Sequence, residues 1–191
     1  MQEFLFYFKL GWEHIISTEA LDHQLFIAAL CAIYTLRDWK QVLILVTAFT
    51  IGHSLTLALS VKNLVYIPSN WVEFLIPCTI VVTAITNLFQ KKFTARSVRV
   101  NYFLALFFGL IHGMGFANAI RIMLASDESF GLGLFGFNVG LEAGQILVVA
   151  CLLLIGKLFL DGFRVNRREW VLFVSAGVFS LSLMMVLERL P

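Results

Sequence analysis

QVLILVTAFTIGHSLTLALSV, at residues 41–61, is a run of 21 residues whose only titratable side chain is an imidazole. At a rise of about 1.5 Å per residue, a helix of this length matches the ~30 Å hydrocarbon core of a bilayer. His53 lies near the centre of the run. An ionisable group at that depth is costly and usually faces the interior of a helix bundle. The stretch therefore predicts a membrane-spanning helix that carries an imidazole into a protein interior.

The rest of the chain has the same apolar character. Only 14% of the 191 residues are charged and 60% are hydrophobic, whereas soluble domains contain about 25% charged residues. We therefore expect one domain, residues 1–191, that is an all-α, polytopic membrane helix bundle of about six transmembrane helices. Residues 1–16 are expected to add a short interfacial or partial helix. Six segments approach the ~20 apolar residues that a span needs: 18–36, 41–61, 71–90, 100–123, 132–158 and 170–188.

The basic residues between these segments predict the orientation, because cytoplasmic loops carry the excess of Lys and Arg. The cytoplasmic side is then the one with ten basic residues, and both termini are expected on the other side of the cell (inner) membrane. The net charge of +2 and the lack of a basic run interleaved with aromatics argue against nucleic acid as a partner. The basic residues expected on the cytoplasmic side are Arg37, Lys40, Lys91, Lys92, Arg96, Arg99, Lys157, Arg164, Arg167 and Arg168, and those expected on the other side are Lys9, Lys62, Arg121 and Arg189.

Histidines and carboxylates lie in or beside the apolar segments. With the predicted orientation, His53 and His112 both fall roughly 18 Å from the inner ends of their spans, and Glu142 roughly 15 Å below an outer end. Asp22 and His23 are expected near the outer face. Imidazole and carboxylate ligands suit divalent transition metals. The pattern therefore predicts a metal site in the outer half of the bundle, open to the outside.

Four further polar residues are expected to line this site. Within 132–158, Asn138, Glu142 and Gln145 follow i, i+4, i+7 spacing and form one polar stripe. Glycines of that segment fall on the opposite side, where small residues let helices pack closely. Thr50 flanks His53 and Glu73 begins the segment 71–90 at its outer end. The expected lining residues are Asn138, Gln145, Glu73 and Thr50.

Four blocks of the sequence resemble signatures of the HupE/UreJ membrane family, in family order. The blocks are GWEHI with LDHQLF (residues 11–26), TAFTIGHSLTL (47–57), FGLIHGMGFA (108–117) and FNVGLEAGQ (137–145). The stretch between the two parts of the first block is longer than the family's usual motif. The resemblance implies a membrane protein associated with nickel, and sometimes cobalt, supply to hydrogenase and urease. It also implies the metal-handling residues His14, Asp22, His23, His53, His112 and Glu142.

Two classes of function fit this pattern, and a third has to be weighed against them. The first is a permease, rather than an enzyme, for Ni2+ and possibly Co2+ or Zn2+, with the metal and the bilayer as partners. The second is an intramembrane zinc hydrolase with Asp22 or Glu142 as general base. The third is an accessory subunit whose histidines serve packing. A permease needs a polar path to the cytoplasm, to which Asn101, Thr83 and Asn87 are expected to contribute.

Overall fold

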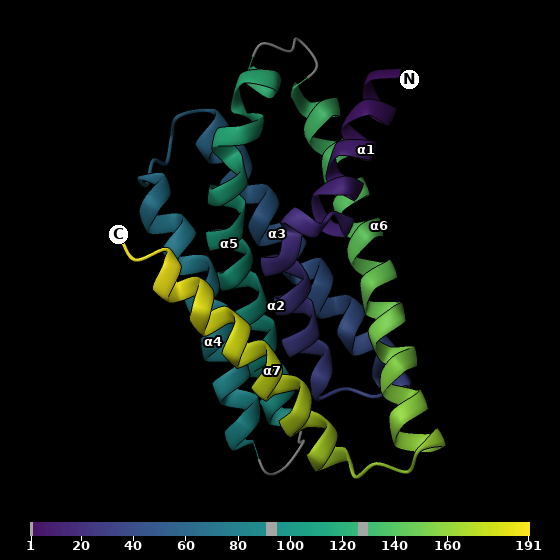
Figure 1. Cartoon of the computed structure of the whole chain (residues 1–191). Coiled ribbons are helices and arrows are strands. Elements are labelled where there is room, and N and C mark those ends of the chain that lie inside the picture. Colours follow the sequence, from purple (N-terminus) through teal and green to yellow (C-terminus); the bar gives the residue numbers. More distant parts are fainter. Residues whose placement is uncertain (1, 91–94, 126–129) are drawn as a thin grey trace.

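The computed structural model describes residues 2–90, 95–125 and 130–191, with side chains of the middle range described over residues 101–117. All regular elements in these ranges are helical, which confirms the predicted all-α bundle. Seven longer helices are joined by short connections (Figure 1). They are α1 (Gln2–Ile16), α2 (Leu21–Ala32), α3 (Trp39–Val61), α4 (Ser69–Phe89), α5 (Ala95–Ala125), α6 (Phe130–Lys157) and α7 (Arg167–Glu188), with short helical turns at Thr18–Ala20, Leu36–Asp38 and Leu158–Gly162.

The lengths and compositions of the helices fit a bilayer. Helix α5 has 31 residues and packs beside α3 (Figure 1). Helices α1 and α2 reach the length and hydropathy of a span only as a pair, bent by 57° at the break between them. Five of the six predicted segments match helices whose ends differ by at most five residues. The helical segments long and apolar enough to cross a membrane by themselves, among the described residues, are Leu36–Val61, Ser69–Phe89, Phe130–Gly162 and Arg167–Glu188.

The first predicted segment, 18–36, is the one that differs, because α2 occupies only 12 residues. Polar and ionisable side chains are frequent from residue 13 to residue 24, and they interrupt the apolar pattern. The backbone leaves the helical conformation at Ser17, which has φ −64° and ψ 155°. The chain therefore crosses the bundle as two half-helices, and the predicted partial N-terminal helix is the first of them (Figure 1).

A glutamine side chain stabilises the break between the half-helices. The last carbonyl groups of a helix have no partner within that helix and need other donors, above all away from water. Gln24 Nε2 donates to the carbonyl oxygens of Ile15 and Ser17, at 3.1 and 3.0 Å. The amide thus replaces the main-chain donors that a continuous helix would supply.

Glycines bring two pairs of helices into backbone contact. A Cβ atom at any of five glycines would overlap a main-chain carbonyl group of the opposite helix. Because the helices can approach only where that atom is missing, these contacts set the spacing of the bundle. The glycines of α6 face α1, which is the packing face predicted opposite the polar stripe. The five positions are Gly11 and Gly140 between α1 and α6, and Gly52, Gly109 and Gly113 between α3 and α5.

Two arginines at the start of α7 join this helix to the ends of α2 and α4. The Arg168 guanidinium donates to the carbonyl oxygens of Leu88 and Gln90, at 2.5 and 2.7 Å, where α4 ends. Arg167 donates to the carbonyl oxygen of Ile33, just after α2, at 2.6 Å. A cationic side chain on terminal carbonyls is a favourable helix cap. These bonds hold the start of α7 against the ends of α2 and α4.

Candidate metal centre

The break between α1 and α2 places two histidines beside each other. His14 lies in the last turn of α1 and His23 in the first turns of α2, with ring centroids 4.7 Å apart. His53, in the middle of α3, lies 6.0 Å from each of them. His112, on α5, lies 5.0 Å from His23. The four histidines of the chain therefore meet from four helices at one point of the bundle.

Three of these rings are arranged for joint coordination. His14, His23 and His53 each offer a nitrogen within 4.8 Å of the other two. Nitrogen ligands bind zinc at about 2.0–2.1 Å, which in tetrahedral geometry separates them by about 3.3 Å. The rings therefore need to approach by only about 1.5 Å to surround one ion, which is within the reach of side-chain rotation.

Hydrogen bonds on the far side of two rings, His23 and His112, leave their Nε2 lone pairs free. His112 Nδ1 is 2.9 Å from the carbonyl oxygen of Phe108, which only accepts, so Nδ1 holds the proton and Nε2 the lone pair. His23 Nδ1 is 3.0 Å from Asp22 Oδ1, which fixes the same tautomer. Within the described part of the chain, no hydrogen-bond partner meets Nε2 of His14, His23 or His112, or either nitrogen of His53. Buried polar groups without a hydrogen-bond partner are rare in folded proteins.

Asp22 lies beside the cluster as an orienting carboxylate. Its Oδ1 accepts from the main-chain N–H of His23 at 2.8 Å as well as from the ring. Its Oδ2 lies 3.7 Å from the Arg189 guanidinium, at the end of α7. A carboxylate that holds the far side of a histidine ring raises the basicity of the ligand nitrogen and fixes its direction. The geometry thus gives Asp22 a role behind His23.

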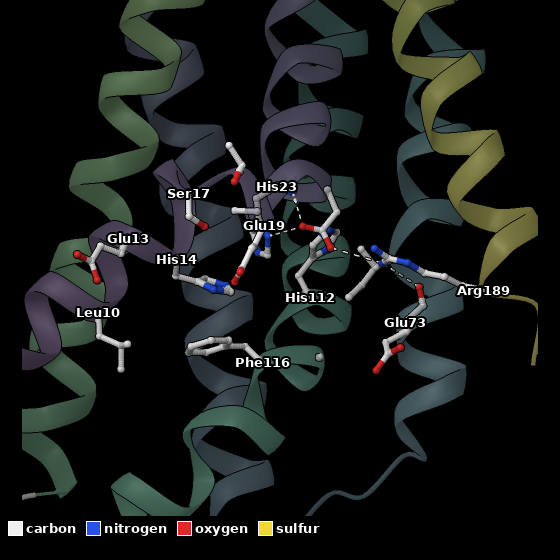
Figure 2. Close-up of a pocket in the computed structure, with 15 residues that line it drawn as sticks. Leu10, Glu13, His14, Ser17, Glu19, His23, Glu73, His112, Phe116 and Arg189 are labelled. Atoms are coloured by element: carbon white, nitrogen blue, oxygen red, sulfur yellow. Dashed lines mark hydrogen bonds and ion pairs between the residues drawn. The ribbon is translucent and has the colours of Figure 1, made fainter.

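A cavity of about 720 Å³ leads to the histidines, between the α1–α2 break, α4, α5 and the end of α7 (Figure 2). His14, His23 and His112 line it, whereas His53 lies behind them and is fully buried. Figure 2 shows the His14 ring above Phe116 and His112 on the side of Arg189. The cavity therefore makes these three histidines accessible from the surface of the bundle.

Carboxylates outnumber cations around this cavity. Glu13, Glu19 and Glu73 are exposed at its rim, and Asp22 lies deeper inside. Arg189 is the one basic residue among the described residues that line it. Clefts lined by one sign of charge raise the local concentration of the opposite ion. The charge distribution favours entry of a cation.

Aromatic rings pack around the cluster, with Phe116 at the cavity and the others on the buried sides. Phe116 lies 3.9 Å from His14, between ring centroids, and stacks on Phe137 at 5.0 Å. Phe49 lies 5.1 Å from His112 and 6.0 Å from His23. The rings on α3 and α6 shield these sides of the cluster from water, whereas the other side of the cluster borders the cavity.

The polar stripe of α6 faces α3 and does not reach the histidines. Its three residues bond to hydroxyl groups of α3, and Glu142 Oε1 accepts from Thr47 at 2.7 Å. On α3 these hydroxyl groups are rotated by about 60–120° from His53, at about 100° per residue. Of the predicted lining residues, Glu73 borders the cavity, whereas Thr50, Asn138 and Gln145 lie in the interface between α3 and α6. The other bonds are Thr50 to Gln145 and Ser54 to Asn138.

Some residues of the site have no clear signal in the sequence. Glu13 and Glu19 flank the break of the first span, and only recognition of that break would have placed them at a cavity. Arg189 follows the last helix, 167 positions after Asp22, and no spacing rule connects the two. The interruption of hydropathy around Ser17 is the signal that could have revealed the break.

Comparison with known families matches residues 1–189 to the model described as HupE / UreJ protein. The match extends over essentially the whole chain, including every residue of the histidine cluster and of the cavity around it. No curated protein and no solved structure matches the chain.

Proposed function

The chain belongs to the HupE/UreJ family, and from that premise we propose that it is a permease for a divalent transition metal. The family is linked to metal handling, and the proposed cargo is Ni2+, with Co2+ and Zn2+ as alternatives. The metal is a substrate here rather than a resident cofactor. The observation that carries the proposal is the cluster of His14, His23 and His53, whose buried ring nitrogens face one another without hydrogen-bond partners in the described chain.

The proposed direction of transport follows from the charges. Under the positive-inside rule the connections α2–α3, α4–α5 and α6–α7 face the cytoplasm, and both termini lie outside the inner membrane. The acidic rim of the cavity is built from the α1–α2 break, the start of α4 and the end of α7. These parts belong to the outer side in this orientation. A cation therefore enters from outside and meets His14, His23 and His112 first.

The ligand chemistry suits a cargo that is bound and released. Neutral imidazoles bind Ni2+, Co2+ and Zn2+, and the cluster includes no thiolate that would retain a soft metal. The described cysteines are separate: Cys31 is buried in α2, and Cys78 and Cys151 lie on other helices. Metal binding to imidazole competes with protons, so release is also favoured in acid.

The positions of the carboxylates support transport over hydrolysis. A zinc hydrolase needs a base next to a metal-bound water. Asp22 is held by His23 and Arg189, and Glu142 bonds to Thr47 in the α3–α6 interface. A packing role for the histidines is disfavoured as well, because buried polar groups that serve packing are normally satisfied by hydrogen bonds.

The test uses Co2+ as an optical probe on protein in detergent, and then Co2+ and Ni2+ uptake into proteoliposomes that contain a metal indicator. His53→Ala is expected to weaken Co2+ binding by more than the about 10–100-fold that loss of an outer-shell partner costs. Ser175→Ala is the matched control, because Ser175 is also fully buried and lacks a hydrogen-bond partner in the described chain, but lies on α7. Uptake no faster than in empty vesicles, or equal binding by both variants, contradicts the proposal.

A further inference from the structure

A second, smaller cavity lies between α2, α4 and α5, on the side of the histidines away from the acidic rim. Its volume is about 20 Å³, enough for one water molecule or one small ion. Polar side chains reach it from α4 and α5, and apolar side chains form the rest of its wall. The polar lining residues are Thr83, Thr86, Asn87 and Asn101.

Phenylalanine rings separate this inner cavity from the histidine cluster. Phe26 and Phe108 line the inner cavity, and their ring centroids are 5.8 Å apart. The Phe26 ring also lies 5.6 Å from His112, and the Phe108 carbonyl oxygen accepts from His112 Nδ1. His112 therefore borders the outer cavity on one side, and Phe26 stands between it and the inner cavity. Phe26 is 3% exposed, so its ring is buried between the two cavities.

The inner cavity offers oxygen ligands without a fixed charge. The ten described residues that line it include no acidic or basic side chain. Asn87 is held by a bond from its Nδ2 to the Ala29 carbonyl oxygen at 2.6 Å, and Asn101 Nδ2 donates to the Tyr34 hydroxyl at 3.3 Å. Burial raises the pKa of Tyr34 to about 12, so the phenol stays neutral at physiological pH.

Resting on the proposed function, we propose that the inner cavity is a second binding site for the transported cation, and that Phe26 is the barrier between the two sites. A cation that leaves the imidazoles finds hydroxyl and amide oxygens, which bind Ni2+ and Co2+ more weakly than nitrogen does. Weak binding suits a site from which the ion leaves for the cytoplasm. The barrier keeps the path closed while the outer site is occupied.

The experiment measures Co2+ binding and Co2+ uptake on the same variants. Thr83→Val, which keeps the shape of the side chain, and Asn101→Leu are each expected to slow uptake about tenfold or more, since a lost polar contact raises the barrier. Their Co2+ spectra and affinities at the histidine cluster are expected to match those of the wild type. Thr83→Val keeps the test decisive if Asn101→Leu does not fold.

Phe26→Leu tests the barrier against Phe179→Leu, a partly buried ring of α7 that packs on the hydrophobic core. Phe26→Leu is expected to speed uptake or to let Co2+ leak, whereas Phe179→Leu is expected to do neither. Normal uptake by Thr83→Val and Asn101→Leu, or equal effects of the two phenylalanine variants, overturns the inference. Failure of the wild type to bind Co2+ at all refutes the proposed function instead, so the two failures are distinguishable.

Discussion

Replacing His53 with leucine is expected to stabilise the metal-free protein and to abolish metal binding. His53 is fully buried, and neither of its ring nitrogens has a hydrogen-bond partner in the described chain. A buried polar group in that condition costs about 1–3 kcal/mol of folding free energy. Leucine fills a similar volume and carries no polar atom, so the substitution removes this cost. Most substitutions in a core have the opposite sign.

The size of the effect follows from two opposing terms. Loss of the unpaired nitrogens gains about 1–3 kcal/mol, whereas leucine fits less well against the Phe137 ring, at a cost of up to about 1.5 kcal/mol. For a chain of this size each kcal/mol shifts Tm by about 2–4 °C, so a rise of a few degrees is expected. Metal at a hundred times its Kd stabilises the wild type by about 2.7 kcal/mol. The variant gains none of this, so the order of the two Tm values reverses when Co2+ is added.

The assay is thermal unfolding in detergent, with chelator and then with saturating Co2+. His112→Leu is the matched control, because His112 Nδ1 bonds to the Phe108 carbonyl oxygen and only Nε2 lacks a partner in the described residues. Its gain in the metal-free state is expected to be smaller than that of His53→Leu. The reasoning is refuted if metal-free His53→Leu melts several degrees below the wild type, or if Co2+ stabilises it equally.

Three other outcomes follow from the structure. Glu142→Gln is expected to leave Co2+ affinity within about twofold, because Glu142 lies in the α3–α6 interface. Asp22→Asn is expected to weaken Co2+ affinity about 10–100-fold, because it frees the His23 ring. Calorimetric titration measures both affinities, and equal losses contradict this assignment. Gly140→Ala is expected to lower the free energy of unfolding by about 1–3 kcal/mol or more, since its Cβ would overlap the Phe8 carbonyl group. Thermal unfolding measures this loss, with Gly177→Ala as the control, because a Cβ at Gly177 meets nothing within 4 Å. Acid is expected to release Co2+, because protons compete with the metal for the imidazole nitrogens. A Co2+ spectrum that persists in acid until the protein unfolds argues against histidine ligation.

Hydropathy predicted most of the fold, because length and apolar composition alone determine which segments can cross a bilayer. It failed at residues 18–36, where a window of about 20 residues averages over the polar run around Ser17. A broken span is specified by local events, namely the extended backbone at Ser17 and the Gln24 amide on the carbonyl of Ile15. Neither event leaves a periodic signal in the sequence.

Predicting the site requires the depth of each residue within its span and the direction in which its side chain points. Only the depth can be read from residue counts. His53 and His112, expected at equal depth, each lie near His23 in the structure, with ring centroids 6.0 and 5.0 Å from its ring. Glu142 has a similar expected depth, yet it points to Thr47, because the rotation of α6 is set by its glycine contacts with α1. His14, which precedes the first expected span, lies within the cluster because α1 packs against α6 and ends at the break inside the bundle.

The glycine contacts divide the ligands between two bodies. One body is α1 with α6 and carries His14, and the other is α3 with α5 and carries His53 and His112. His23 lies on α2, after the break at Ser17, and belongs to neither pair. Under the proposed function, an ion held by His14 and His53 would be a cross-link between the two bodies, and its coordination number would report their relative position. Spectroscopy of a bound Co2+ ion thus measures the spacing of the halves of this bundle as well as the occupancy of its site.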